Sequence, residues 1–400
     1  MKYLIILGDG MSDYPLPQLG NKTPLMVARK PDIDSLCQKS RCGLFQTVPT
    51  DMPPGSEIAN MAVLGYNVRE VYQGRGVLEA ASMGVDILPD DLALRCNLIC
   101  IENEKIKNHS AGHISDEEAR ELILFLDEKL GNENIRFYPG VSYRHLLVIK
   151  NGKNDIKCTP PHDVPGAPYR EVLVRPAESH SETADLLNDL IFISMELLKG
   201  HPVNIRRRNA GKDAANSIWP WSPGYRPKMK TLQELFGISG AVISAVDLLY
   251  GIGRYAGMKA IKVPGSTGLY NTNYEGKAEA AVEALKDNDL VYLHIEASDE
   301  AGHEGNVDLK VKTIEYLDSR VVRYVVEKTA KMNEPVAIAI LPDHPTPCAL
   351  RTHVHDPVPF MIYHPGIPGD EVMQYDEESV KKGFYGLLKE DEFIKAFLNK

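Results

Sequence analysis

Three short, mostly apolar runs, far apart in the chain, most constrain how it can fold. They are Tyr3–Leu7, Leu290–Ile295 and Val336–Leu341, each bounded by turn residues and separated by segments of helical pattern. Continuous apolar strands that alternate with helices are typical of a parallel sheet with both faces covered. The sequence therefore predicts an α/β fold whose core is a mainly parallel sheet sandwiched by helices.

Polar side chains follow each of these runs within a few residues. Asp9 follows the first run, Asp299 and His303 follow the second, and Asp343-His344 follows the third. Ligands of open parallel sheets gather at the carboxyl ends of the strands, so we expect these side chains to meet at one sheet edge. Asp and His suit divalent Zn, Mn or Mg, and a pair of such ions is suited to phosphoryl transfer. The pattern predicts a metal-dependent enzyme.

The spacing within the later clusters leaves some choices open. Asp299 and His303 lie four residues apart, so a helix would put both on one face, where they could share an ion or form an ordinary surface pair. The segment 351–359 contains His353 and His355, which compete for the remaining ligand position. Either histidine could instead bond the backbone of its loop.

Ser56 is the candidate nucleophile. It follows Pro54-Gly55 and precedes the helical pattern Glu57–Leu64, so it would lie at a helix N-terminus, where free N–H groups and the helix dipole favour a bound phosphate. A metal ion beside this hydroxyl could lower its pKa and make it attack phosphorus. The alternative is an ordinary N-cap serine. The metal-binding pattern elsewhere in the chain favours the nucleophile.

The middle of the chain differs from the rest in its residue composition. A chain of 400 residues is long enough for two domains, and residues 97–235 contain a helix candidate at Asp116–Lys129 and a proline-rich segment at Thr159–Pro168. This stretch holds histidines, arginines and aromatic residues but none of the metal-ligand candidates. We therefore expect a discontinuous metal-binding core, residues 1–96 and 236–400, with an inserted substrate-binding domain of residues 97–235.

Composition excludes several classes of protein. A net charge of −10 argues against nucleic-acid binding, and the basic run Arg206–Arg208 lacks interleaved aromatic residues, so it fits a small anionic ligand or a solvated turn. The six cysteines form no C-x-x-C motif and no disulfide framework. Since no apolar stretch approaches the length of a signal sequence or a membrane span, we expect a cytoplasmic protein with no membrane partner.

Several motifs spread along the chain together carry a family resemblance. They are Gly8-Asp9-Gly10, Pro54-Gly55-Ser56-Glu57-Ile58-Ala59-Asn60, Tyr72-Gln73-Gly74-Arg75-Gly76, Leu94-Arg95-Cys96-Asn97, His201-Pro202-Val203-Asn204, Asp299-x-x-x-His303, Asp343-His344 and His353-x-x-Asp356-Pro357-Val358-Pro359. They resemble the archaeal-type cofactor-independent phosphoglycerate mutases of the alkaline phosphatase superfamily. The resemblance implies a phosphatase-like core with two divalent ions, a transiently phosphorylated serine, and a mobile second domain that holds the glycerate.

The resemblance also implies roles for individual residues. One ion would be bound by Asp299, His303 and His353, and the other by Asp9, Ser56, Asp343 and His344. The oxygens of the substrate's phosphate or carboxylate would be held by Arg75, Arg95 and one of Arg206 and Arg207. His109 and His113 could move protons near a bound hydroxyl, or bond backbone in tight loops. The expected partner is a small phosphorylated metabolite, and a homo-oligomer is possible.

The match to this family changes in the predicted second domain. The family carries Arg-Gly-Ala-Gly where this chain has Trp221-Ser222-Pro223-Gly224, and an arginine where His113 stands. Those departures resemble a bacterial branch proposed to act as a homoserine kinase. Three interpretations therefore remain: a mutase interconverting 2- and 3-phosphoglycerate, a phosphotransferase making O-phosphohomoserine, and a non-catalytic metal-binding scaffold. The mutase accounts for more of the motifs.

Overall fold

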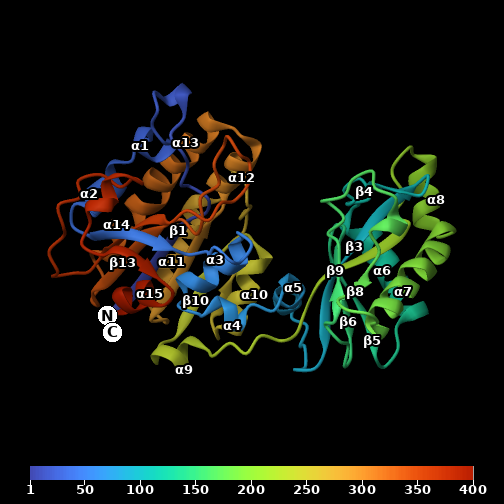
Figure 1. Ribbon diagram of the computed structural model, residues 1–400. Helices are drawn as coiled ribbons and strands as arrows, with labels where there is room; N and C mark the ends of the chain where they lie inside the picture. The colour runs from blue at the N-terminus through green and yellow to red at the C-terminus, as the bar shows by residue number, and fades with distance from the viewer. Residues whose placement is uncertain (400) are drawn as a thin grey trace. The chain divides into compact units, whose positions relative to one another are not determined.

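The computed structural model describes residues 1–399 and divides into two compact units (Figure 1). Unit 1 consists of Met1–Tyr72 and Lys228–Lys400, and unit 2 of Gln73–Pro227. Unit 2 is thus inserted in the sequence of unit 1. Among the described residues, no helix has both the length and the apolar character needed to cross a membrane.

Unit 1 is built on one eight-stranded sheet with the strand order β11-β10-β12-β1-β13-β14-β2-β15. In chain order its strands are β1 (Lys2–Gly8), β2 (Arg41–Gln46), β10 (Gly240–Ile243), β11 (Lys259–Ile261), β12 (Leu290–Ile295), β13 (Val336–Leu341), β14 (Val358–Tyr363) and β15 (Gly386–Lys389). The five strands from β11 to β13 are parallel to one another, whereas β14 is antiparallel to both β13 and β2. The three apolar runs of the sequence are the central strands β12, β1 and β13.

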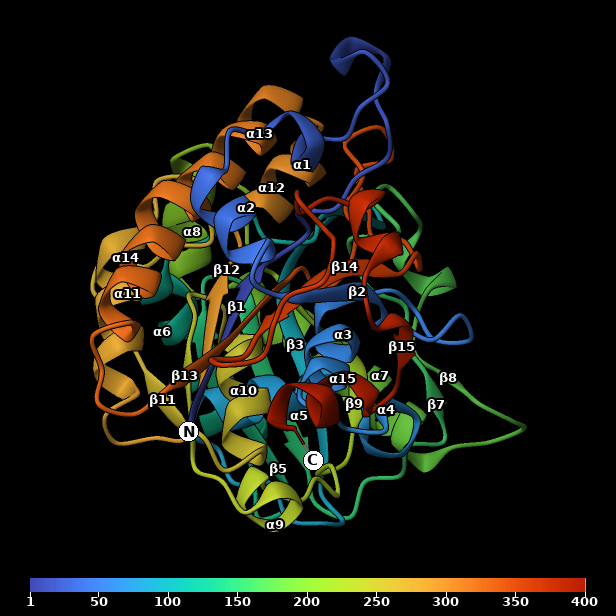
Figure 2. The same ribbon diagram turned by 90° about the vertical axis from the view of Figure 1, so that its left-hand side faces the viewer.

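Helices cover both faces of this sheet (Figure 2). Those of unit 1 are α1 (Pro24–Val27), α2 (Pro31–Cys37), α3 (Ser56–Val63), α4 (Val68–Val71), α9 (Leu232–Phe236), α10 (Asp247–Tyr255), α11 (Tyr274–Ala284), α12 (Ala297–Glu304), α13 (Val307–Tyr316), α14 (Arg323–Thr329) and α15 (Glu392–Leu398). Leu4 and Ile6 of β1 pack in one core cluster with Ala278 and Ala281 of α11. On the other face, α3 contacts α10, and α10 contacts β10. The predicted α/β class with a mainly parallel, helix-covered sheet is confirmed.

Unit 2 has its own antiparallel sheet and its own core. The sheet contains β3 (Leu92–Glu102), β4 (Lys105–Asn108), β5 (Ile135–Val141), β6 (Arg144–Ile149) and β9 (Ser217–Gly224), and a separate small ribbon pairs β7 (Ile156–Lys157) with β8 (Arg175–Pro176). Its helices are α5 (Arg75–Ser82), α6 (Asp116–Leu130), α7 (Glu182–Lys199) and α8 (Pro202–Asn209). Trp219 is fully buried in this core, which also contains its sequence neighbours Ile218 and Trp221.

The structure places the boundaries of unit 2 elsewhere than the sequence prediction of 97–235. Residue 97 lies in the middle of β3, a continuous strand of 11 residues that pairs with both β6 and β9. Helix α5 packs closely on this strand, since a Cβ added at Gly76 would lie 2.9 Å from the Ala93 carbonyl oxygen. The segment from residue 73 therefore belongs to unit 2, and a boundary at 97 would split its main strand.

Candidate metal centre and nucleophile

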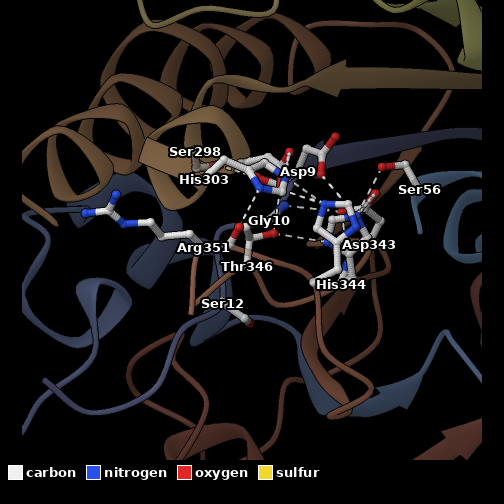
Figure 3. A network of polar contacts seen from close by, with 12 residues as sticks. Asp9, Gly10, Ser12, Ser56, Ser298, His303, Asp343, His344, Thr346 and Arg351 are labelled. Carbon is white, nitrogen blue, oxygen red and sulfur yellow. Dashed lines mark hydrogen bonds and ion pairs between the residues drawn. The ribbon is translucent and has the colours of Figure 1, made fainter. Parts of the chain in front are cut away.

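The carboxyl ends of three central strands bring the predicted ligands of unit 1 together. Asp9 directly follows β1, Asp343 lies two residues after β13, and helix α12, which carries Asp299, begins two residues after β12. Strand order places β1 between β12 and β13, so the three carboxylates start from neighbouring strands. Figure 3 shows Asp9 and Asp343 within a network of polar contacts that also includes His303 and His344.

Asp299, His303 and His353 form one group of convergent ligand atoms. The Nε2 atom of His303 lies 3.2 Å from Asp299 Oδ2 and 2.9 Å from His353 Nε2, and the latter lies 3.5 Å from Asp299 Oδ1. The neighbouring His355 instead has its Nε2 2.7 Å from the carbonyl oxygen of Met52. Of the two histidines in this loop, His353 therefore faces the cluster and His355 bonds backbone.

Asp9, Asp343, His344 and Ser56 form the adjoining group. His344 Nε2 lies 3.7 Å from Asp9 Oδ1, 3.4 Å from Asp343 Oδ2 and 3.1 Å from Ser56 Oγ. Asp343 and His344 have no exposed surface, and Asp9 is almost fully buried. His344 also joins the two groups, because its ring stacks on that of His353 with 3.8 Å between centroids.

Ser56 occupies the first position of helix α3, but its hydroxyl does not cap the helix. The N-cap residue is Gly55, and the cap makes no side-chain hydrogen bond. The Ser56 side chain is half-buried and points toward Asp343 and His344 at one end of the network in Figure 3. The contact with His344, rather than helix capping, accounts for the direction of this hydroxyl.

The electrostatics of the cluster fit bound divalent cations. Burial, followed by the negative charges of Asp343 and Asp299, raises the pKa of Asp9 well above its usual range. Asp9 Oδ1 is buried and has no hydrogen-bond partner among residues 1–399. A buried carboxylate oxygen without a donor, surrounded by other carboxylates and imidazoles, is stabilised by a cation. Carboxylate oxygens and imidazole nitrogens suit divalent metals.

Gly10 is required by the close approach of two of these loops. Its φ is +60°, and a Cβ at this position would lie 2.5 Å from Asp299 Oδ1 and 2.6 Å from Thr346 Oγ1. Its amide donates to Asp343 Oδ1 at 3.2 Å. Only glycine combines this left-handed conformation with space for the neighbouring carboxylate, which explains the Asp9-Gly10 pair in the sequence.

In unit 2, two of the residues predicted to bind substrate, Arg75 and Arg95, lie close together. Arg95 lies within β3, is 6% exposed, and has its guanidinium carbon 4.5 Å from the centre of the Trp221 ring. Glu79 Oε1 lies 3.2 Å from Arg95 Nε and 3.5 Å from Arg75 Nε. The Glu79 carboxylate thus contacts both guanidinium groups.

His109 and His113 lie beside the same aromatic cluster of unit 2. Both rings contact Tyr143 edgewise, at centroid distances of 5.7 and 6.3 Å. His162 links His109 to Trp221, at 6.1 and 5.2 Å from the two rings. Burial, followed by the nearby His162 and His113, lowers the pKa of His109. A neutral His109 ring can accept or donate a hydrogen bond near pH 7.

Arg206 and Arg207, on helix α8, bond to other groups of unit 2. Arg206 is exposed and lies 3.4 Å from Glu121. Arg207 is buried and makes several protein contacts: it donates to the carbonyl oxygens of Ala111 and Asp213 and pairs with Glu118. Arg207 therefore holds the loop before α6 and has few N–H groups left for a ligand.

Three buried residues that support the site escaped the sequence analysis. They are Asn60, His294 and Thr346, all without exposed surface. Thr346 Oγ1 donates to Asp299 Oδ1, and its position two residues after His344 is a signal that the sequence did contain. Asn60 lies one helical turn after Ser56 and so faces the same way. His294 lies within the apolar run of β12, where a buried histidine requires a polar partner.

Asn60 connects Ser56, the candidate nucleophile, to Asp343, a candidate metal ligand. Its Nδ2 donates to the Ser56 carbonyl oxygen at 2.8 Å and to Asp343 Oδ2 at 2.9 Å, while its Oδ1 accepts from the Tyr292 hydroxyl. We expect Asn60→Leu to weaken Mn²⁺ binding by about 10–100-fold, because outer contacts orient ligating carboxylates. Titration with Mn²⁺ measures the loss. Tyr292→Phe is the matched control: it leaves both Nδ2 bonds in place, so an equal loss in both variants would contradict this role.

The chain is similar in sequence to known proteins of one family. Residues 37–204 match the family model described as 2,3-bisphosphoglycerate-independent phosphoglycerate mutase. A protein of that name from Methanosarcina acetivorans is 52% identical over 396 residues, which cover 98% of each chain. A probable enzyme of the same name from Geobacter sulfurreducens is 47% identical over 403 residues, again 98% of each chain.

Two solved structures resemble the whole chain. The PH0037 protein from Pyrococcus horikoshii has a TM-score of 0.84 and 31% identity, covering 100% of this chain and 96% of that one. The cofactor-independent phosphoglycerate mutase from Thermoplasma acidophilum has a TM-score of 0.69 and 26% identity, covering 100% and 99%. By its full-length similarity to the named relatives, the chain belongs to the 2,3-bisphosphoglycerate-independent phosphoglycerate mutase family.

Proposed function

We propose that this protein interconverts 3-phosphoglycerate and 2-phosphoglycerate through a phosphoserine at Ser56. The observation that carries the proposal is the Ser56 hydroxyl, which is free of any capping role and lies 3.1 Å from His344 Nε2 beside convergent carboxylates and imidazoles. Family membership supports the reaction, since the relatives bear the name of that enzyme.

We assign two divalent ions to the two groups of ligand atoms. Asp299, His303 and His353 would hold one ion, and Asp9, Asp343, His344 and Ser56 the other, each being Mn²⁺, Zn²⁺ or Mg²⁺. When bound, such ions lower the pKa of a hydroxyl and neutralise charge on phosphoryl oxygens. The short distances within each group and the buried, partnerless Asp9 Oδ1 support this assignment.

The reaction transfers one phosphoryl group twice and consumes no water. In the first step, Ser56 Oγ forms a bond to phosphorus, loses its proton, and the bond to the glycerate 3-oxygen breaks; that oxygen takes up a proton. In the second, the 2-hydroxyl oxygen of the glycerate forms a bond to phosphorus and loses its proton, the bond between Ser56 Oγ and phosphorus breaks, and Ser56 recovers a proton. The free N–H groups at the start of α3 favour the negative charge of the phosphoryl group throughout.

The basic cluster of unit 2 is the proposed support for the substrate's anionic groups. Arg95 and Arg75 both lie beside Glu79, and their guanidinium groups are suited to bind a carboxylate or phosphate oxygen. His109 and His113, whose rings flank Tyr143, are proposed as hydrogen-bonding groups for the glycerate hydroxyl. His113 stands where the archaeal pattern carries an arginine, and it is a reason to test homoserine as well.

Phosphorus NMR tests the substrate directly. Metal-loaded protein is incubated with 3-phosphoglycerate in one sample and with homoserine plus ATP in another, with a chelator-treated sample of each as control. We expect 2-phosphoglycerate in the first sample, no O-phosphohomoserine in the second, and no turnover after chelation. O-Phosphohomoserine as the sole product would contradict the mutase assignment and point to His113 and Trp221 as the residues that select the substrate.

A further inference from the structure

Asp9 is the end of a chain of three hydrogen-bonded side chains. His294, in strand β12, has no exposed surface, and its Nε2 lies 3.0 Å from Asp9 Oδ2. Its other ring nitrogen, Nδ1, lies 3.2 Å from the hydroxyl oxygen of the buried Ser244, which directly follows β10. The order is thus Ser244, His294, Asp9, running from the interior of unit 1 to the metal-ligand cluster.

The neighbours of Ser244 determine which nitrogen of His294 carries the proton. The Val246 amide donates to Ser244 Oγ at 3.0 Å, so this oxygen already accepts one hydrogen bond. Its own proton can then be donated to His294 Nδ1, an arrangement that leaves the hydrogen of the neutral ring on Nε2. His294 Nε2 therefore carries hydrogen and donates to Asp9. The other tautomer would direct a nitrogen lone pair at an ionised carboxylate, the form of Asp9 that binds a cation.

This arrangement separates the two oxygens of Asp9 by role. Oδ2 accepts from His294, whereas Oδ1 has no hydrogen-bond partner among the described residues and lies 3.7 Å from His344 Nε2. The ligand atoms of Asp9, His294 and Asp343 all lie within 4.8 Å of one another, which is also compatible with three ligands on one ion. A protonated Nε2 has no lone pair to offer, so the hydrogen-bond pattern favours a contact from His294 to Asp9 over a bond from His294 to the ion.

We propose that His294, oriented by Ser244, is a positioning residue that holds Asp9 with one oxygen directed at the cation, and that His294 is not itself a metal ligand. The end of β12 is further held by Lys277, a residue without exposed surface whose Nζ donates to the His294 carbonyl oxygen at 3.3 Å. The inference rests on the proposed cation site at Asp9, but not on which substrate the enzyme uses.

Metal-binding measurements on three variants test this role. In His294→Gln, the amide nitrogen can still donate toward Asp9, whereas His294→Leu removes the donor, and Ser244→Ala removes only the group that orients the ring. Mn²⁺ affinity is measured by titration, and the visible spectrum of the Co²⁺-loaded protein reports the number and type of ligands. We expect His294→Leu to bind Mn²⁺ about 10–100-fold more weakly, and His294→Gln to recover most of that loss with an unchanged Co²⁺ spectrum.

Each outcome of this experiment decides the question. A glutamine variant that binds as weakly as the leucine variant, with an altered Co²⁺ spectrum, would make His294 a ligand. A leucine variant with wild-type Mn²⁺ affinity would show that His294 has no role in metal binding. If the leucine variant does not fold, Ser244→Ala carries the test, with affinity about 10-fold weaker expected and unchanged affinity overturning the proposal. The proposed function is tested by a separate observation. It would be wrong if the wild-type protein bound Mn²⁺ but did not convert 3-phosphoglycerate.

Discussion

Replacing Ser56 by alanine is expected to abolish turnover while leaving the fold and most of the metal binding intact. The hydroxyl is the only part of the side chain that the proposed reaction uses, and no helix cap is lost because Gly55 is the N-cap residue. Asp9, Asp343 and His344 remain to hold the ion. We expect kcat to fall by about 10⁴-fold or more, since only binding and electrostatic contributions would remain.

A serine elsewhere in unit 1 provides the matched control. Ser319 is exposed, and its Oγ donates to the Glu315 carbonyl oxygen one helical turn earlier. Ser319→Ala should therefore keep wild-type turnover and stability. Activity is followed by phosphorus NMR, metal binding by Mn²⁺ titration, and folding by circular dichroism. Wild-type turnover in Ser56→Ala would remove the phosphoserine from the mechanism, and unchanged function of a protein without any turnover would favour the scaffold interpretation.

Replacing Lys310 by methionine is expected to have the largest effect on stability. Lys310, in α13, has no exposed surface, and its ammonium group donates to Asp13 Oδ2 at 2.9 Å, to the Ser12 carbonyl oxygen at 3.0 Å and to the Thr346 carbonyl oxygen at 2.8 Å. It thus ties the loop that follows Asp9 to the loop that follows His344. Methionine would leave Asp13 as a buried charge without its cation, at a cost of about 3–5 kcal/mol.

The stability prediction is tested by urea unfolding followed by circular dichroism. Lys310→Met should lower the unfolding midpoint of unit 1 and weaken Mn²⁺ binding, because both tied loops carry ligands. Lys312→Met, on the exposed side of the same helix, is the control and should change stability by about 0.5 kcal/mol or less. The double variant Asp13→Asn, Lys310→Met should lose less free energy of unfolding than the two single variants lose together. An unfolding midpoint unchanged in Lys310→Met would contradict the role given to this lysine.

The sequence revealed the central sheet because its strands are buried on both faces. β1, β12 and β13 read as continuous apolar runs, and acidic or histidine residues after each run pointed to the shared sheet edge. The boundary of unit 2 was not accessible in the same way. Strand β3 begins at Leu92, directly after the turn at Pro89-Asp90-Asp91, but this turn lies inside unit 2 and does not mark the boundary at residue 73.

The supporting residues of the site were harder to find than its candidate ligands. Asp-x-x-x-His and Asp-His are spacings that a reader can recognise, whereas the contacts of Asn60 and His294 depend on pairings between α3, β12 and the loop after β1. Lys310 is more than 290 residues from Asp13 in the sequence. Such partners become visible only when the sheet brings distant segments together, and no local pattern encodes them.

Trapping the phosphorylated enzyme tests the central proposal most directly. Metal-loaded protein is mixed with 3-phosphoglycerate, quenched in acid, digested, and searched by mass spectrometry for a peptide that carries one added phosphoryl group. The proposal predicts phosphate on Ser56 in the wild-type protein and no phosphopeptide in Ser56→Ala. Phosphate on a different residue, or full turnover without any phosphorylated peptide, would contradict it.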